Sequence, residues 1–86
     1  MTLSDRDLAL LEFEARWQQH GAAKEEAIRR ELALSPARYY QLLNRLIDTA
    51  DALAHDPLLV HRLRRLREVR AREHVIRATA SAGPAR

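Results

Sequence analysis

The sequence lacks cysteine and is poor in glycine, proline and aromatic residues. Without cysteine, neither a disulfide bond nor a thiolate metal site can reinforce the fold of this 86-residue chain. Two glycines and three prolines supply little material for β-turns, and an aromatic content of 5% supplies little for strands. No apolar run approaches the roughly 20 residues that a membrane-spanning helix needs. These absences favour one small, mainly helical domain and no membrane partner.

A secretory signal is also missing from the start of the sequence. Acidic residues, Asp5 and Asp7, stand where such a signal carries basic residues followed by an apolar run. We therefore expect a cytoplasmic protein, associated with the nucleoid if it binds DNA.

Positive charge is concentrated in the last third of the chain. The net charge is +3, but residues 1–60 carry seven Lys or Arg and ten Asp or Glu, whereas residues 61–86 carry eight Arg and two Glu. Fourteen arginines accompany a single lysine, Lys24, and codon usage in a GC-rich genome accounts for that ratio. It does not account for the crowding of arginine into one segment, which favours a polyanionic partner, nucleic acid first.

The hydrophobic periodicity predicts four helices joined by short connections. Three starts carry capping residues, at Ser4, at Ser35 before Pro36, and at Asp56 before Pro57. Gly21 is expected to stop the first helix. The predicted helices span residues 5–20, 22–32, 36–47 and 57–78, with a short helical turn at residues 50–54.

Three aromatic positions are predicted to fill the core. Phe13 and Trp17 stand one turn apart in the first helix, and Tyr39 shares a stripe with leucines in the third. Tyr40 is expected at the edge, where its hydroxyl meets a phosphate or the last helix. In the second helix the pattern places Ala23, Ala27, Ile28 and Leu32 inward and Lys24, Glu25, Arg29 and Arg30 outward.

The second and third helices, three residues apart, predict a helix-turn-helix. Gln41 and Asn44 suit adenine, whereas Arg38 and Arg45 suit guanine or phosphate, and Ser35 lies where helix amides bind phosphate. Two residues depart from the usual motif, because Ala33 replaces the turn glycine and Arg29 replaces a small residue. Small helical bundles without DNA function share this architecture, so a protein-interaction module stays as the alternative.

The last helix is too long for a three-helix core to cover, so its distal half is expected to project or to pair with something. It is expected to bind phosphates through Arg62, Arg65 and Arg72, to form a homodimer or bind another protein, or only to complete the core. The interface in the second case is Leu59, Leu63, Leu66, Val69 and Ile76. The predicted organisation is a helix-turn-helix bundle at residues 4–55, a long basic helix at residues 56–79 and a flexible tail at residues 80–86.

Catalytic chemistry finds little support in the sequence. The four histidines are scattered without the His-x-x-x-His spacing of a metal site, and Ser35 is already expected to cap a helix. We therefore expect no catalytic residue, no metal, no cofactor and no enzymatic activity.

Three segments carry a resemblance to a known family. They are Lys24 to Arg29, Ser35 to Asp48, which contains the phrase Tyr-Tyr-Gln-Leu-Leu-Asn-Arg-Leu-Ile-Asp, and Asp56 to Arg67. Across about residues 5–70 the chain resembles a family of short actinobacterial helix-turn-helix-like proteins of unknown function. The resemblance implies an actinobacterial cytosol and no particular mechanism.

Taken together, the sequence predicts an all-α bundle containing a helix-turn-helix and a long Arg-rich C-terminal helix. The predicted function is double-stranded DNA binding, and a protein-binding adaptor that uses the last helix is the alternative.

Overall fold

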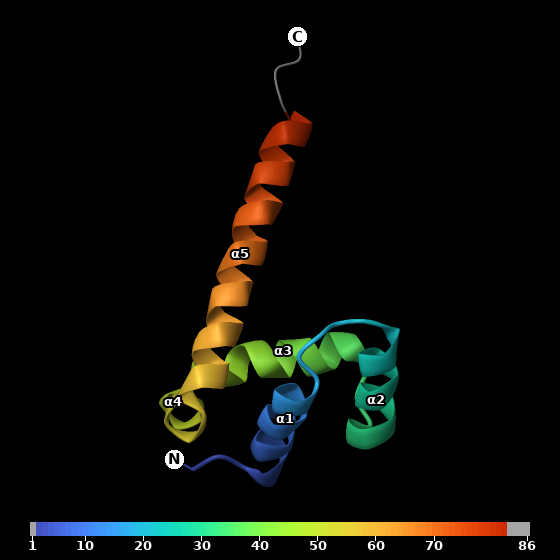
Figure 1. The fold of residues 1–86 in the computed structure, drawn as a ribbon, viewed down its shortest axis with the longest axis vertical. Helices are drawn as coiled ribbons and strands as arrows, with labels where there is room; N and C mark the ends of the chain where they lie inside the picture. Colours follow the sequence, from blue (N-terminus) through green and yellow to red (C-terminus); the bar gives the residue numbers. More distant parts are fainter. Residues whose placement is uncertain (1, 83–86) are drawn as a thin grey trace.

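The computed structural model describes residues 2–82, and within that range the chain is helical and contains no strand (Figure 1). The all-α prediction is confirmed. The predicted turn at residues 50–54 is a helix of its own, and the last helix extends four residues beyond the predicted end. Of the predicted flexible tail, residues 80–82 are helical and residues 83–86 lie outside the described range. The helices are α1 (Asp5–Arg16), α2 (Ala22–Leu32), α3 (Pro36–Leu46), α4 (Ala50–His55) and α5 (Pro57–Ala82).

Side-chain caps fix where four of the helices begin. The Ser4 hydroxyl accepts a bond from the amide of Asp7 at 3.0 Å, and the Asp7 carboxylate accepts one from the amide of Ser4 at 3.1 Å. Ser35 and Thr49 cap α3 and α4 in the same way, through their hydroxyl oxygens. Asp56 caps α5 by accepting from an amide one turn ahead. Each cap satisfies an amide that has no partner inside its helix, which explains why the predicted starts are correct.

The prediction that the first helix runs to residue 20 is wrong, because α1 ends at Arg16. The backbone leaves the helix at Trp17, whose ring lies against the ring of Phe13 with centroids 6.0 Å apart. Gly21 does not stop α1. It stands before α2 with φ at +151°, a conformation that only glycine adopts readily. The three residues between Trp17 and Gly21 therefore form a connection rather than a last helical turn.

The turn between α2 and α3 requires a left-handed residue. Ala33 ends α2 with φ at 55° and ψ at 37°, and its amide donates to the carbonyl of Arg29. This conformation costs an L-residue with a Cβ roughly 1–2 kcal/mol. Alanine at position 33, where glycine is usual, therefore adopts the left-handed conformation of the turn but is strained in it.

The core lies where α1, α2, α3, α4 and the first turn of α5 meet. In Figure 1, α3 crosses the bundle, with α2 at its N-terminal end and α4 at its C-terminal end. Phe13 and Tyr39 are fully buried, as predicted, and their rings meet edge to face. Trp17 is only half-buried. The buried apolar residues are Leu10, Leu11, Phe13, Ala27, Ile28, Tyr39, Leu43, Leu46, Ile47, Ala52, Leu59 and Val60.

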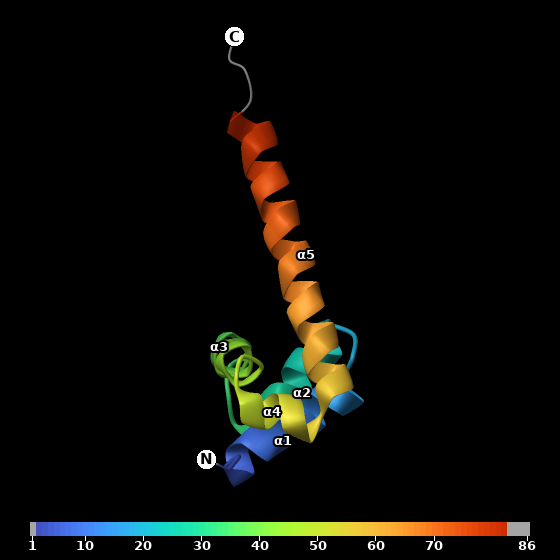
Figure 2. The same cartoon turned by 90° about the vertical axis from the view of Figure 1, so that its left-hand side faces the viewer.

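The distal half of α5 projects away from the bundle (Figures 1 and 2). Within residues 57–79 of this helix only Leu59 and Val60 are fully buried, and every side chain from Glu68 to Thr79 is exposed. The bundle therefore leaves the described part of α5 beyond Arg67 uncovered. No helix within the described range is both long enough and apolar enough to cross a membrane.

Two arginines fasten α5 to the end of α3. Arg64 donates through Nε to the carbonyl oxygen of Ile47 at 2.7 Å. Arg67 makes two bonds to the carboxylate of Asp48, at 2.8 and 3.1 Å, and a third to the carbonyl oxygen of Asn44. Hydrogen bonding from Arg67 holds the pKa of Asp48 below its ordinary value. Two carbonyls at the C-terminal end of α3, those of Asn44 and Ile47, are thus satisfied from α5.

Replacing Ala33 with glycine is expected to stabilise the protein by about 0.5–1 kcal/mol, because glycine adopts the left-handed conformation without strain. Ala37→Gly, in the first turn of α3, is the matched control and should destabilise by about 0.5 kcal/mol. Urea unfolding followed by circular dichroism measures both. A loss of stability in Ala33→Gly equal to that of the control would contradict the strain at this turn.

Asp48→Asn is expected to lower the urea midpoint at neutral pH, because it removes one end of the Arg67 bonds. The folded protein holds the pKa of Asp48 below the ordinary 3.8. Its contribution is therefore present above that value and is lost as the pH falls through the folded-state pKa. The difference between wild type and variant should accordingly shrink in acid. Asp51→Asn, which removes a carboxylate with no arginine partner in the described range, should give a smaller midpoint change.

Candidate nucleic-acid interface

The outward side of α3 carries the residues predicted to contact bases. Arg38, Gln41 and Arg45 are exposed, and their spacing of three and four places them on one side of the helix. Arg38 donates through Nη1 to the Oε1 of Gln41 at 3.3 Å. Asn44 is also exposed and lies beside α5, since its carbonyl oxygen accepts from Arg67. The structure therefore brings four of the predicted groove residues together on one surface.

Ser35 and Tyr40, the other two predicted contacts of this region, are already bonded within the chain. The Ser35 hydroxyl caps α3 by accepting from the amide of Arg38 at 3.2 Å. The Tyr40 hydroxyl lies 2.7 Å from Nδ1 of His20, in the connection that follows α1. Partial burial and the charge of Glu14 raise the pKa of the Tyr40 hydroxyl. Tyr40 was expected to contact either a phosphate or the last helix. The structure agrees better with the second contact, because His20, which contacts the Tyr40 hydroxyl, also contacts Arg70 of α5.

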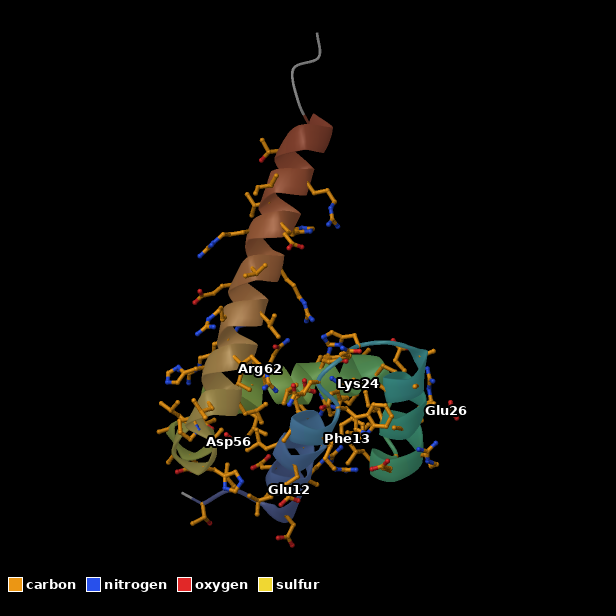
Figure 3. All side chains as sticks on the ribbon, viewed as in Figure 1. Glu12, Phe13, Lys24, Glu26, Asp56 and Arg62 are labelled. Carbon is orange, nitrogen blue, oxygen red and sulfur yellow. The ribbon has the colours of Figure 1, made fainter. Side chains whose placement is uncertain are left out.

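The arginines of α5 differ in how far the bundle engages them. Arg64, Arg67 and Arg70 turn toward the bundle, where they contact Ile47, Asp48 and His20. Arg65 and Arg72 are exposed, and no carboxylate lies within ion-pair distance of either in the described part of the chain. Arg62 is intermediate, because one of its terminal nitrogens is buried without a hydrogen-bond partner. The predicted phosphate contacts at Arg65 and Arg72 are therefore accessible, whereas Arg62, at the base of α5 in Figure 3, is partly enclosed.

The five apolar residues predicted as an interface on α5 do not share one surface. Leu59 is buried and Leu63 packs against the core, so these two complete the bundle. Leu66, Val69 and Ile76 are exposed by 38%, 39% and 67%. Leu58, next to Leu59 in the first turn of α5, is 84% exposed. The apolar periodicity of α5 continues beyond the part of the helix that the bundle covers. Residues with the same spacing therefore lie in the core near the start of α5 and on the surface further along it.

A buried ion pair supports α3 from beneath. Lys24 of α2 donates to the Oε1 of Glu14 in α1 at 2.8 Å, and the side chains are only 1% and 3% exposed. The Tyr39 hydroxyl donates to the same oxygen at 2.6 Å. The Lys24 ammonium also lies within 6 Å of the ring centres of Tyr39 and Tyr40. Burial and the Glu14 carboxylate raise the pKa of Tyr39 well above its usual range, so this hydroxyl stays protonated and donates.

The prediction that Lys24 faces outward is wrong, and Ala23, predicted to be buried, is exposed. Figure 3 shows Lys24 on the inner side of α2 near Phe13, and Glu26 on the outer side. The sequence pattern assigns Lys24 to the solvent side because burial of an unpaired charge is costly. The pattern within α2 cannot reveal its partner, because Glu14 lies on α1. One signal was present in the sequence. Lys24 stands three and four residues before Ala27 and Ile28, on their side of the helix.

A second polar chain connects the bundle to α5. His20 contacts Tyr40 through Nδ1 and the Nη2 of Arg70 through Nε2. Partial burial, followed by the positive charges of Lys24 and Arg70, lowers the pKa of His20. The imidazole therefore remains neutral at neutral pH and accepts from Arg70. No group of three or more His, Cys, Asp or Glu residues that could hold a metal ion exists within residues 2–82.

Comparison with known protein families identifies the family to which the chain belongs. Residues 2–75 match the sequence model of a family described as a protein of unknown function, DUF3263. The chain belongs to the DUF3263 family. The expected kinship with a family of unknown function is thereby confirmed. Searches of curated proteins and of solved structures gave no match. The DUF3263 segment contains α1 to α4 and most of α5, and so includes the α3 surface and the buried ion pair.

Replacing Lys24 with methionine is expected to destabilise this DUF3263 protein by about 3–5 kcal/mol, because it leaves the Glu14 carboxylate buried without its cation. Tyr39→Phe removes one hydrogen bond but keeps the ion pair, and should cost about 1–3 kcal/mol. Urea unfolding measures Tyr39→Phe even if Lys24→Met does not fold. Lys24→Met with wild-type stability would show that Glu14 is not held as a buried charge.

Proposed function

We propose that this protein is a small, non-enzymatic DNA-binding protein that places α3 in the major groove of double-stranded DNA. The observation that carries the proposal is the outward side of α3, where Arg38, Gln41 and Arg45 are exposed together. These side-chain types pair with base edges in the major groove, arginine with guanine and glutamine with adenine. The groove is about 12 Å wide and accepts one α-helix.

The connection between α2 and α3 supports a helix-turn-helix arrangement. Three residues separate the two helices, Ala33 takes the left-handed conformation of the turn, and Ser35 caps the second helix. Packing of α2 against the N-terminal end of α3 leaves the outward side of α3 uncovered. In such motifs the first helix braces on the DNA backbone while the second enters the groove.

The structure refines the role proposed for α5. Arg64 and Arg67 are engaged with α3, so they contribute less to phosphate binding than the sequence count suggests. Arg65 and Arg72 remain exposed for electrostatic contact with the DNA backbone. On this proposal the protein is a transcriptional regulator or nucleoid-associated protein of an actinobacterial cell, working in its cytoplasm.

A second candidate function is a protein-binding adaptor, for instance of the transcription machinery, or a homodimer joined through α5. The observation that favours it is the apolar surface of the projecting half, where Val69, Val75 and Ile76 are exposed. Exposed apolar side chains of this size on a helix that leaves its own core are typical of an interaction surface.

Arg45→Ala is expected to weaken binding to a random duplex about tenfold, because an arginine contact to DNA contributes roughly 1–3 kcal/mol. Arg72→Gln should flatten the logarithmic salt dependence by about one unit, since one phosphate contact is lost. Fluorescence anisotropy across a salt series measures both changes. Arg16→Ala, which removes an arginine from α1, is the matched control and should bind like wild type.

Absence of duplex binding at about 50 mM salt would contradict the DNA proposal, because electrostatic attraction is strong at that ionic strength. Mass measurement of the free protein and of the complex belongs to the same experiment. A dimer that does not bind DNA, and that Leu66→Asp converts to monomer, would instead support the second candidate.

A further inference from the structure

A cavity of about 150 Å³ lies between α3, α5 and the connection that follows α1. Its apolar wall consists of Leu43 and Ile47 from α3 and of Leu63 and Leu66 from α5. The side chains of the polar chain described above, His20, Tyr40 and Arg70, line the other part. Of the residues that line the cavity, Tyr40 and Asn44 are also among the predicted contacts with DNA, whereas His20, Arg70 and the apolar wall are not, so the cavity raises a separate question of function.

The size of the cavity limits the occupant to a small molecule. Apolar cavities of about 150 Å³ accept one benzene ring. Four aliphatic side chains on one wall and a few convergent polar groups opposite are the usual composition of a small-molecule site. An occupant with a single ring or a branched aliphatic body would therefore contact α3 and α5 at once.

The charges around the cavity leave one cation without a carboxylate. Lys24 offsets the charge of Glu14, and Asp48 offsets that of Arg67. His20 is kept neutral by partial burial and by its cationic neighbours. Arg70 contacts only the His20 ring, and no carboxylate lies within ion-pair distance of it in the described range. The polar end of the cavity thus attracts one negative charge.

The Glu14 carboxylate, on the inner side of the cavity, limits the negative charge that an occupant can carry. Its side chain is 3% exposed and lines the cavity, and both of its hydrogen bonds, from Lys24 and Tyr39, end on Oε1. Among the described residues no donor bonds its second oxygen, Oε2. This oxygen, which has no hydrogen-bond partner in the described range, would repel a second anionic group on the occupant but would accept a hydrogen bond from a neutral one.

We propose that the cavity binds a small monocarboxylate whose apolar body has the size of one ring, with its carboxylate on Arg70 and its body against Leu43, Ile47, Leu63 and Leu66. The carboxylate takes the place of the His20 ring as the partner of Arg70. A planar carboxylate matches the fork of donors on a guanidinium better than an imidazole nitrogen does. This binding site is independent of the proposed contact with DNA.

Benzoate is the probe, titrated into the full chain by calorimetry and followed by amide chemical shifts. We expect saturable binding of one benzoate per chain, with a dissociation constant on the order of 1 mM for a ligand of this size. The largest shifts should fall on residues 40–47 and 63–70. Benzyl alcohol and benzylamine, of similar size but without the negative charge, should bind at least about tenfold more weakly. Terephthalate, with a second carboxylate, should also bind more weakly than benzoate.

Arg70→Gln is expected to weaken benzoate binding at least about tenfold, the loss typical of a charge-assisted bond. Arg72→Gln, two residues further along the same helix and outside the cavity, is the matched control and should bind like wild type. Leu66→Phe, which fills the cavity from its partly exposed wall, should abolish binding. Circular dichroism confirms that each variant is folded.

Three results would overturn the proposal. One is no saturable binding of benzoate up to about 10 mM, well above the affinity expected for its size. Another is an equal loss in Arg70→Gln and Arg72→Gln, which would show general attraction to a basic helix. A third is equal affinity for benzyl alcohol and benzoate, which would remove the role of the carboxylate. None of these results bears on DNA binding, which the duplex titration decides separately.

Discussion

The buried bond between Lys24 and Glu14 is the constraint on which the arrangement of the helices depends. Each charge loses its hydration when the chain folds, and the loss is compensated only if the two groups meet with good geometry and a further donor. That donor is the hydroxyl of Tyr39. Because the three residues belong to α1, α2 and α3, they must come together at once, and a core this small has few other contacts that fix the position of α2.

The same network extends to α5 and divides its arginines by function. Tyr40 lies beside Lys24 and reaches His20, which in turn meets Arg70. Arg64 and Arg67 hold the base of the helix on the C-terminal end of α3. The basicity of this segment therefore serves two purposes, since one side of α5 stabilises the fold and the other remains exposed. A helix attached in this way stands beside the outward side of α3, so a contact with nucleic acid and a ligand between α3 and α5 would involve the same pair of helices.

Local signals made a large part of the fold predictable. Ser4, Ser35 and Asp56 cap helices where the sequence indicated, because a cap depends only on residues within one turn of it. The exposed side of α3 was also predictable, since the spacing of Arg38 and Gln41 follows the helical period. The end of α1 was not, because Trp17 leaves the helix to pack its ring on Phe13 while His20 reaches toward α3. The prediction that Lys24 faces solvent failed for a related reason, because the site that stabilises its ammonium group exists only when α1 and α3 surround it.

By itself, the sequence determined the helical class, the helix starts, the polar side of α3 and the separation of an acidic body from a basic last helix. These properties follow from residue spacing and from contacts within one turn. Only the tertiary structure decided which charges are buried, which arginines of α5 are engaged with the bundle, and that a cavity lies between α3 and α5. Each of these depends on groups brought together from distant parts of the chain, and the free energy of a charge or of a cavity wall is set by its surroundings rather than by its neighbours in sequence.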